Sequence, residues 1–171
     1  LRTPLTRIKL QLALIKDEKI SNELSEDVLE MEKMLNEYLQ FTKTGSNEIT
    51  QKFNMVDLIK SIAKKYVNSN IEFNETKEID FEGRKDSLKR CFNNFFENSL
   101  KHGNKVIVSI RVLRKEIIIN IEDNGPGIPV SEYENVFKPF YKIDKSRSES
   151  KNSVGLGLSI SSDIIRSHGG K

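Results

Sequence analysis

The sequence has 171 residues, of which 36% are hydrophobic and 31% charged, with a formal net charge of +3. This length predicts one ordinary domain with at most a small accessory element, and the net charge is too small to indicate nucleic acid as a partner. The single cysteine, Cys91, excludes an internal disulfide and fits a reducing compartment. No apolar run in the sequence approaches the ~18 residues of a membrane span, and no signal-peptide pattern is present.

The first 45 residues carry two heptad patterns. Apolar residues at spacings of four and three predict a first helix over residues 1–16, a polar break at 17–22, and a second helix to about residue 43. The two seams are Leu1, Leu5, Ile8, Leu12 and Ile15, and then Leu24, Val28, Met31, Leu35 and Tyr38. Gly45 is the expected C-cap of the second helix. This pattern predicts an antiparallel helical hairpin.

Both predicted helices carry more apolar surface than one partner covers, since Leu10, Leu14 and Leu29 lie off the main seams. We infer that two hairpins pair into a four-helix bundle, which makes the protein a homodimer through residues 1–45. The alternative is a hairpin that docks on its own globular domain.

A polar linker at 46–52 is expected to lead into a second domain at 53–171. The apolar pattern there predicts helices near 56–66, over 86–101 and over 155–167, short strands at 71–74 and 79–82, and a strand pair within 106–121. This order predicts an α+β sandwich with helices on one face of a mixed sheet. Cys91 lies on an apolar helix face, where a small buried residue is expected.

A glycine loop follows the isoleucine-rich strand that begins at Glu116. Asp123 places a carboxylate at the strand end, where it can accept a hydrogen bond from an exocyclic amine such as that of adenine. Gly125 and Gly127 can take positive φ and let the backbone approach a flat ligand, and Pro126 stiffens the loop. The alternative is a strand followed by an ordinary β-turn.

Asn94, Asn98 and Lys101 share one face of the predicted helix 86–101, because they are spaced at i, i+4 and i+7. Two carboxamides and an ammonium group suit a hydrated Mg²⁺ ion and phosphate oxygens, since Mg²⁺ keeps several waters and needs few protein ligands. The alternative is a solvated helix face.

Gly155-Leu156-Gly157-Leu158 opens the last predicted helix, where free backbone N–H groups form an anion site. Before it, Phe137 and Phe140 begin a long polar stretch that suggests a lid anchored by these aromatics, from which Arg147 reaches phosphate. The alternatives are a loose loop before the helix and aromatics that fill the core.

These motifs together carry a family resemblance. Asn94-x-x-x-Asn98, Asp123-x-Gly125-x-Gly127, Phe137-x-x-Phe140 and Gly155-x-Gly157 occur in the order of the N, G1, F and G2 boxes of sensor histidine kinases. Leu-Arg-Thr-Pro-Leu-Thr at residues 1–6 resembles the segment directly after the phosphoacceptor histidine, and is most similar to the osmolarity-sensor (EnvZ-type) branch. The resemblance covers nearly the whole chain. It implies a dimerisation and histidine-phosphotransfer hairpin followed by a GHKL/Bergerat-type ATP-binding domain.

The resemblance implies that Asp123 binds the adenine amine and that Asn98 coordinates Mg²⁺ with Asn94 beside it. Lys101 and His102 would contact phosphates, and Asn94 and Lys101 would take part in catalysis. The other nucleotide-binding residues that it implies are Gly125, Gly127, Ile128, Phe137, Phe140, Tyr141, Arg147, Gly155, Leu156, Gly157 and Leu158. The implied cofactors are therefore ATP and Mg²⁺.

The family's phosphoacceptor histidine would lie just before Leu1, and neither His102 nor His168 stands in that context. The chain as given is thus expected to bind ATP without autophosphorylating. Thr3 occupies the family position four residues after the histidine, which implies a phosphatase role, although it also suits a first-turn residue before Pro4. Thr3, Thr6, Leu10 and Gln11 are the expected response-regulator contacts.

The function expected from the resemblance is a histidine protein kinase core, the cytoplasmic portion of an inner-membrane-anchored bacterial receptor. It transfers the γ-phosphoryl group of ATP to the upstream histidine and then to an Asp of a response regulator. The family usually adds a final strand pair after the position of Lys171, so the catalytic domain is expected to be truncated at its C-terminus. One rival is a gyrase- or chaperone-type ATPase, which would place a glutamate at Asn94; the other is a dimerising adaptor with a degenerate nucleotide site, against which Asn98 and Asp123 argue.

Overall fold

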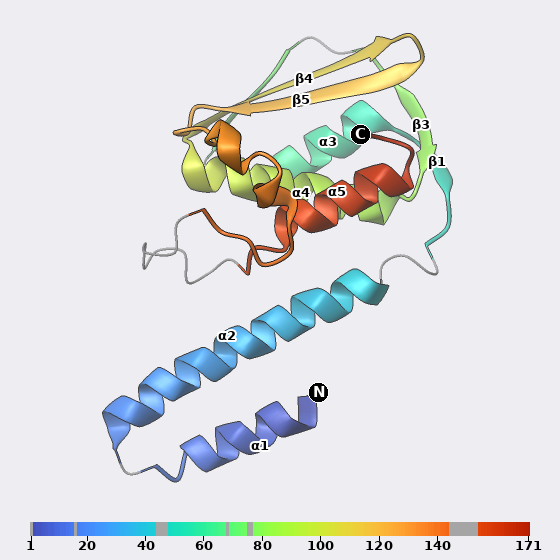
Figure 1. Ribbon diagram of the computed structural model, residues 1–171. Coiled ribbons are helices and arrows are strands. Elements are labelled where there is room, and N and C mark those ends of the chain that lie inside the picture. The colour runs from blue at the N-terminus through green and yellow to red at the C-terminus, as the bar shows by residue number, and fades with distance from the viewer. Residues whose placement is uncertain (1, 16, 44–47, 68, 75–76, 144–153) are drawn as a thin grey trace.

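The computed structural model describes residues 2–15, 17–43, 48–67, 69–74, 77–143 and 154–171 (Figure 1). Two helices, α1 (Arg2–Leu12) and α2 (Glu18–Lys43), come first, and an α/β domain follows. Within the described ranges, no helix combines the length and the apolar character that crossing a bilayer demands.

Helices α1 and α2 pack together through Leu5, Leu12 and Val28, which are buried, with Leu35 partly buried beside them. Helix α1 ends at Leu12, earlier than the seam predicts. Ser21 Oγ donates a 2.9 Å hydrogen bond to the Leu12 carbonyl and so satisfies one of the free groups at this helix end.

The predicted polar break at 17–22 is mostly helical, because Asp17 starts α2 itself. Its Oδ1 accepts hydrogen bonds from the backbone N–H groups of Lys19 at 3.0 Å and Ile20 at 3.2 Å. An aspartate at this position satisfies donors that have no partner inside the helix.

The off-seam residues Leu10, Leu14 and Leu29 are 67%, 81% and 54% exposed, so the single chain leaves these apolar faces uncovered.

The strands form two sheets. In the first, β1 (Gln51–Asn54) pairs antiparallel with β3 (Asp80–Gly83). In the second, β4 (Lys105–Leu113) lies between β2 (Asn70–Phe73), to which it is parallel, and β5 (Glu116–Asp123), to which it is antiparallel. The predicted mixed sheet is therefore confirmed, with a separate two-stranded sheet beside it.

Strand β1 was not predicted, and its first two residues fall in the expected linker. Only Phe53 within this strand is apolar, so no alternation marks it, and its partner in β3, Phe81, lies 28 residues later in the sequence. The next residue, Asn54, caps α3 (Met55–Ala63) by accepting from the N–H groups of Val56 at 2.9 Å and Asp57 at 3.1 Å.

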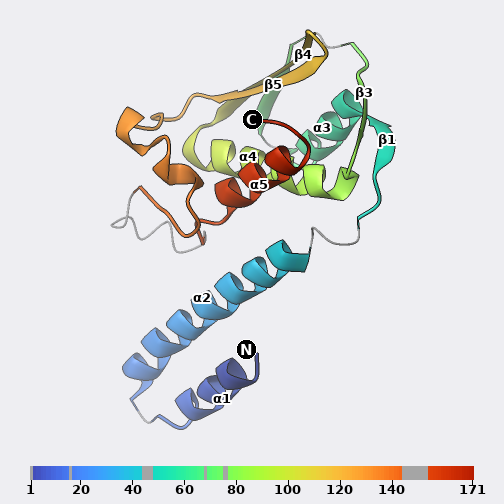
Figure 2. The same cartoon turned by 45° about the vertical axis from the view of Figure 1, so that its right-hand side comes forward.

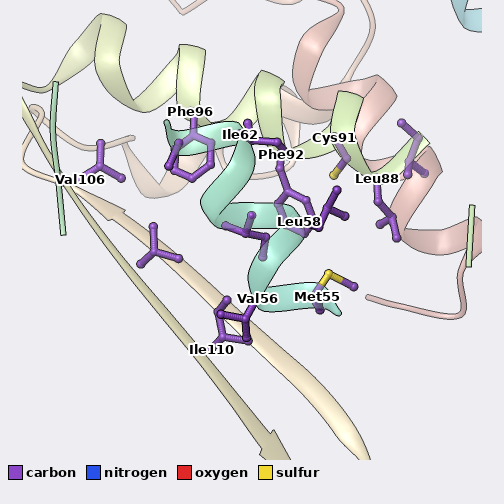
Figure 3. Close-up of a cluster of buried hydrophobic side chains, with 14 of the residues drawn as sticks. Met55, Val56, Leu58, Ile62, Leu88, Cys91, Phe92, Phe96, Val106 and Ile110 are labelled. Carbon is purple, nitrogen blue, oxygen red and sulfur yellow. The ribbon is translucent and has the colours of Figure 1, made fainter. Parts of the chain in front are cut away.

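Helices α3, α4 (Lys85–His102) and α5 (Gly157–Ser167) lie on one face of the three-stranded sheet, as predicted (Figures 1 and 2). Alternate residues of β4, namely Val106, Val108 and Ile110, are buried. They meet a core that includes Ile62 from α3 and Phe96 from α4 (Figure 3). In the described residues 124–143, which follow β5, the chain forms two short 3₁₀ helices, η1 (Val130–Glu132) and η2 (Asn135–Phe137), in a stretch expected to have no regular structure.

The turn between β4 and β5 is strained, and relieving it should stabilise the fold. Arg114 and Lys115 both have positive φ, at 50° and 71°, where side chains with a Cβ are disfavoured. Two-residue turns of this kind favour Asn-Gly. The double substitution Arg114→Asn, Lys115→Gly is expected to raise the free energy of unfolding by about 1 kcal/mol, measured by urea denaturation. An unchanged or lower midpoint would contradict the turn geometry.

Candidate nucleotide-binding site

The middle of α4 contacts the start of α5 through Asn94. The Asn94 Nδ2 group donates to the Gly157 carbonyl at 3.0 Å and to Ser161 Oγ at 3.4 Å. Ser161 Oγ in turn donates to the Gly157 carbonyl at 2.9 Å. A Cβ on Gly157 would lie 3.6 Å from the Asn94 side chain, which is an ordinary van der Waals contact. The first turn of α5 is thereby fixed beside α4.

The C-terminal end of α4 contacts the loop that follows β5. A Cβ on Gly125 would lie 2.8 Å from the carbonyl oxygen of His102, the last residue of α4. Asn124 connects the two segments: its Oδ1 accepts from the N–H groups of Asn104 at 2.9 Å and Lys105 at 3.0 Å, and its Nδ2 donates to Asn104 Oδ1 at 2.7 Å. The glycine loop after β5 is therefore tied to the helix end.

Both glycine motifs thus contact the same helix, α4. Asn94 contacts the second motif and His102 contacts the first, and eight residues of α-helix separate them, a rise of about 12 Å. The sequence predicted these motifs as separate elements, and α4 brings them together along one side of the domain.

Asp123 is exposed at the end of β5, and its Oδ1 accepts the Gly125 N–H at 2.9 Å. The expectation of positive φ holds at Gly127, where φ is 75° and an added Cβ would meet open space. It is wrong at Gly125, which has no such φ. Gly125 is required for a different reason, because a side chain would collide with the backbone of α4.

Asn98 is half-buried on α4 between the two contacts, and its side chain makes no hydrogen bond within the described parts of the chain. Lys101 and His102 are exposed in the last turn, where positive charge is favourable next to the helix C-terminus. A free carboxamide oxygen with a nearby ammonium group fits a hydrated Mg²⁺ ion and the phosphates that it accompanies.

Within the described residues, the N-cap residue Leu156 provides no side-chain hydrogen bond to the first backbone N–H groups of α5. Leu156 is buried and Leu158 half-buried, so they fix the position of the helix start. An α-helix has no internal partners for its first N–H groups, and these groups attract anions. The donor set therefore fits a phosphate chain.

The two ends of the predicted lid cross each other at Phe140 and Gly155. Phe140 donates its N–H to the Gly155 carbonyl at 2.9 Å, and both residues have positive φ, at 63° and 79°. A Cβ on Gly155 would lie 2.9 Å from the Tyr141 carbonyl oxygen and 3.0 Å from the Phe140 carbonyl carbon. Glycine is thus needed at 155 both for space and for backbone conformation.

A polar cluster holds the segment before this crossing. Glu132 accepts hydrogen bonds from Tyr141 Oη and, at 3.1 Å, from Asn135 Nδ2, while Lys138 Nζ donates to Asn135 Oδ1 at 2.7 Å. The bond from Tyr141, with that from Asn135, lowers the pKa of Glu132, and the same bond to Glu132 raises the pKa of Tyr141. Tyr141, predicted as a nucleotide contact, therefore helps to hold the described segment that begins at Glu132.

The alternative that Phe137 and Phe140 fill the core is wrong, while their role as anchors of a lid stays a prediction. They are 46% and 52% exposed, whereas Val136 is 9% exposed. The backbone crossing at Phe140 and the polar cluster around Glu132 hold this segment.

Several predicted residues lie away from this cluster or outside the described parts. Arg147 falls in the undescribed range 144–153, and the side chain of Thr3 in α1 is not described. Thr6, Leu10 and Gln11 are exposed on α1. Ile128 is 38% exposed in the glycine loop.

Sequence reasoning did not identify Asn124, Ser161 or Glu132 as contributors to the site. Asn124 carried a usable signal, because asparagine side chains commonly bond nearby backbone in turns. Cys91 lies where expected: burial raises the pKa of its thiol to about 12, and its carbonyl accepts from Ser161 Oγ at 3.3 Å. It is a packing residue between α4 and α5.

Residues 83–171, slightly more than half of the chain, match the family model for histidine kinase-, DNA gyrase B- and HSP90-like ATPases. The chain belongs to this family. It is 30% identical over 173 aligned residues to the sensor histidine kinase GtrS of Pseudomonas aeruginosa, covering all of this chain and 36% of that protein. It is 33% identical over 190 residues to the histidine-protein kinase ArlS of Staphylococcus aureus, covering 99% of this chain and 42% of that protein.

Among solved structures, the mycobacterial sensor histidine kinase MprB matches with a TM-score of 0.57 and 26% identity, over 71% of this chain and 81% of that one. The chain thus spans well under half the length of the two curated relatives. Its α/β part has the ATP-binding fold of the family, and its similarity to sensor histidine kinases is established. The osmolarity-sensor branch is not singled out by these relatives.

The different contacts of Gly125 and Gly127 lead to a prediction about stability. Gly125→Ala places a Cβ against the backbone of α4, whereas Gly127→Ala has space and only the cost of positive φ. We expect losses of about 3 kcal/mol and about 1 kcal/mol respectively in the free energy of unfolding. Urea denaturation of both variants measures this difference, and equal losses would contradict the described packing of the loop on α4.

Proposed function

We propose that this chain is the Mg²⁺-ATP-binding core of a sensor histidine kinase. The observation that carries the proposal is the position of α4, which holds the Asp123 loop at one end and the start of α5 at Asn94, with Asn98 between them. A nucleotide needs these groups together: an acceptor for the base, an oxygen ligand for the metal, and N–H donors for the phosphates.

In this proposal the free oxygen of Asp123 accepts from the adenine amine, and its other oxygen stays on the Gly125 N–H. Gly127, with open space beside it, lets the loop backbone approach the base. Asn98 coordinates Mg²⁺ with Asn94 beside it, and Lys101 and His102 contact phosphates. Bound Mg²⁺ would stabilise charge on the phosphates, while the protein's contribution is positioning and electrostatic stabilisation.

The remaining contacts complete the proposed site. The residues that we assign to nucleotide binding by resemblance are Ile128, Phe137, Phe140, Tyr141, Arg147, Gly155, Leu156, Gly157 and Leu158. The half exposure of Phe137 and Phe140 suits contact with a ligand better than a core role. Asn94 and Lys101 are proposed to act in catalysis.

The phosphoryl group is proposed to pass to a histidine at the family position preceding Leu1, and then to an Asp of a response-regulator receiver domain.

Residues 1–45 form the dimerisation and phosphotransfer unit, 46–52 the linker and 53–171 the catalytic domain. The exposed Leu14 and Leu29 support dimerisation, because a four-helix bundle would cover them. Thr3 would assist dephosphorylation, and Thr6, Leu10 and Gln11 would contact the regulator. Membrane anchoring and membership of the EnvZ-type branch are inferred from resemblance only.

Nucleotide binding is tested with Asn98→Ala and a fluorescent ATP analogue. Loss of the carboxamide removes a metal ligand, so the affinity in the presence of Mg²⁺ should fall at least about tenfold, with little change when EDTA is present. The control is Asn93→Ala, which removes an asparagine five residues before Asn98, on another face of α4. This variant should bind normally. Equal binding by the two variants would count against the role of Asn98.

Phosphotransfer is tested on the chain extended upstream to include the histidine, incubated with Mg²⁺ and γ-labelled ATP. We expect acid-labile, base-stable labelled protein, which is absent from the Asn98→Ala variant and when the histidine is replaced by glutamine. Hydrolysis without labelled protein would favour an ATPase of the gyrase or chaperone type, and no nucleotide binding would favour an adaptor.

A further inference from the structure

A glutamate outside the α4 segment supplies the cap of the helix that carries the two asparagines. Glu48 lies between the end of α2 at Lys43 and the start of β1 at Gln51. Its carboxylate accepts hydrogen bonds from the Asp86 N–H at 2.5 Å and from the Ser87 N–H at 3.0 and 3.2 Å to its two oxygens, and also from the Ser87 hydroxyl. One side chain thus serves three donors in the first turn of α4.

Helix α4 depends on this contact because its own sequence provides no cap. The N-cap residue, Arg84, makes no side-chain hydrogen bond to the first turn. The first N–H groups of a helix have no internal partners, and a negative charge is favourable there. Ser87 is only 4% exposed, so its hydroxyl also needs a partner within the protein. Glu48, which lies 38 residues before Asp86, accepts hydrogen bonds from the backbone N–H groups of this first turn and from the Ser87 hydroxyl.

The other side of the same helix end is tied to the C-terminus of α5. The Arg84 N–H donates to His168 Nε2 at 3.0 Å, and Arg84 Nη2 donates to the Ser167 carbonyl at 3.0 Å. His168 Nδ1 lies 2.7 Å from the Ile164 carbonyl, so this ring nitrogen donates and Nε2 accepts. The start of α4 is therefore held between Glu48 and α5.

The first turn of α4 and the candidate site are connected by one continuous helix. Asn94 lies seven residues after Ser87, about 10 Å along a continuous helix, and it determines the contact with Gly157. Because a hydrogen-bonded helix can transmit a displacement along its axis, we expect loss of the cap to affect the position of Asn94 and Asn98 relative to α5.

We propose that Glu48 is a positioning residue that couples the segment following α2 to the nucleotide site through the cap of α4. This inference rests on the proposed function, because it takes Asn94 and Asn98 to be nucleotide ligands. Coupling between two sites is reciprocal in free energy. Nucleotide binding must therefore strengthen the contact between Glu48 and the first turn of α4, just as this contact strengthens nucleotide binding.

The test uses Glu48→Ala and Glu48→Gln in the full 171-residue chain. Their Kd for a non-hydrolysable ATP analogue with Mg²⁺ is measured beside amide hydrogen exchange at Asp86 and Ser87. Glu48→Ala should weaken nucleotide binding about three- to tenfold, and Glu48→Gln less, because one acceptor oxygen remains. In the parent chain, nucleotide should slow exchange at Ser87, and this protection should be lost in Glu48→Ala.

Two further variants separate the coupling from general loss of stability. Glu116→Ala, which removes a carboxylate from an exposed position at the start of β5, should leave both Kd and Ser87 exchange unchanged. Ser87→Ala combined with Glu48→Gln should cost less than the sum of the single changes, because both remove the same hydrogen bond.

The outcomes separate the two proposals. Faster exchange at Ser87 with an unchanged nucleotide Kd would overturn the coupling and leave Glu48 as a local helix cap. If the parent chain itself fails to bind Mg²⁺-nucleotide, the proposed function fails, and the coupling that rests on it fails with it.

Discussion

The candidate site depends on the way α4 is fixed along its whole length. The backbone N–H groups of its first turn donate to Glu48. Asn94 in its middle donates to the Gly157 carbonyl, and its last carbonyl lies against Gly125. The buried face of the same helix, with Phe92 and Phe96, packs into the core. The helix therefore fixes both glycine motifs relative to each other, although they are far apart in the sequence.

The glycines show how one residue type meets different physical needs. Gly127 is required by its backbone conformation, Gly125 by the space that α4 leaves, and Gly155 by both. Sequence reasoning could identify the loops because glycine clusters mark tight turns. It could not distinguish these requirements, because the contacts that exclude a side chain at 125 and 155 come from other segments: His102 for Gly125, and Phe140 for Gly155.

The same limit separates the elements that could be predicted from those that could not. Helix α4 and strand β4 follow from apolar periodicity, since their buried faces repeat at the helical and strand periods, and β5 follows from its run of isoleucines. Strand β1 has one apolar residue and exists because β3 pairs with it. The cap of α4 could not be predicted either, because Arg84 suggests none and the side chain that accepts from the first turn, Glu48, lies in what the sequence predicts as a linker.

The two asparagines of α4 look equivalent in the sequence, yet their surroundings assign them different tasks. Asn94 uses its Nδ2 group on the Gly157 carbonyl, so only its oxygen is available to a ligand. Asn98 has no side-chain partner within the described ranges, and its half-buried carboxamide is accessible to water or to a ligand. The helix thus divides its polar face, with one asparagine holding α5 and the other open to a metal or its waters.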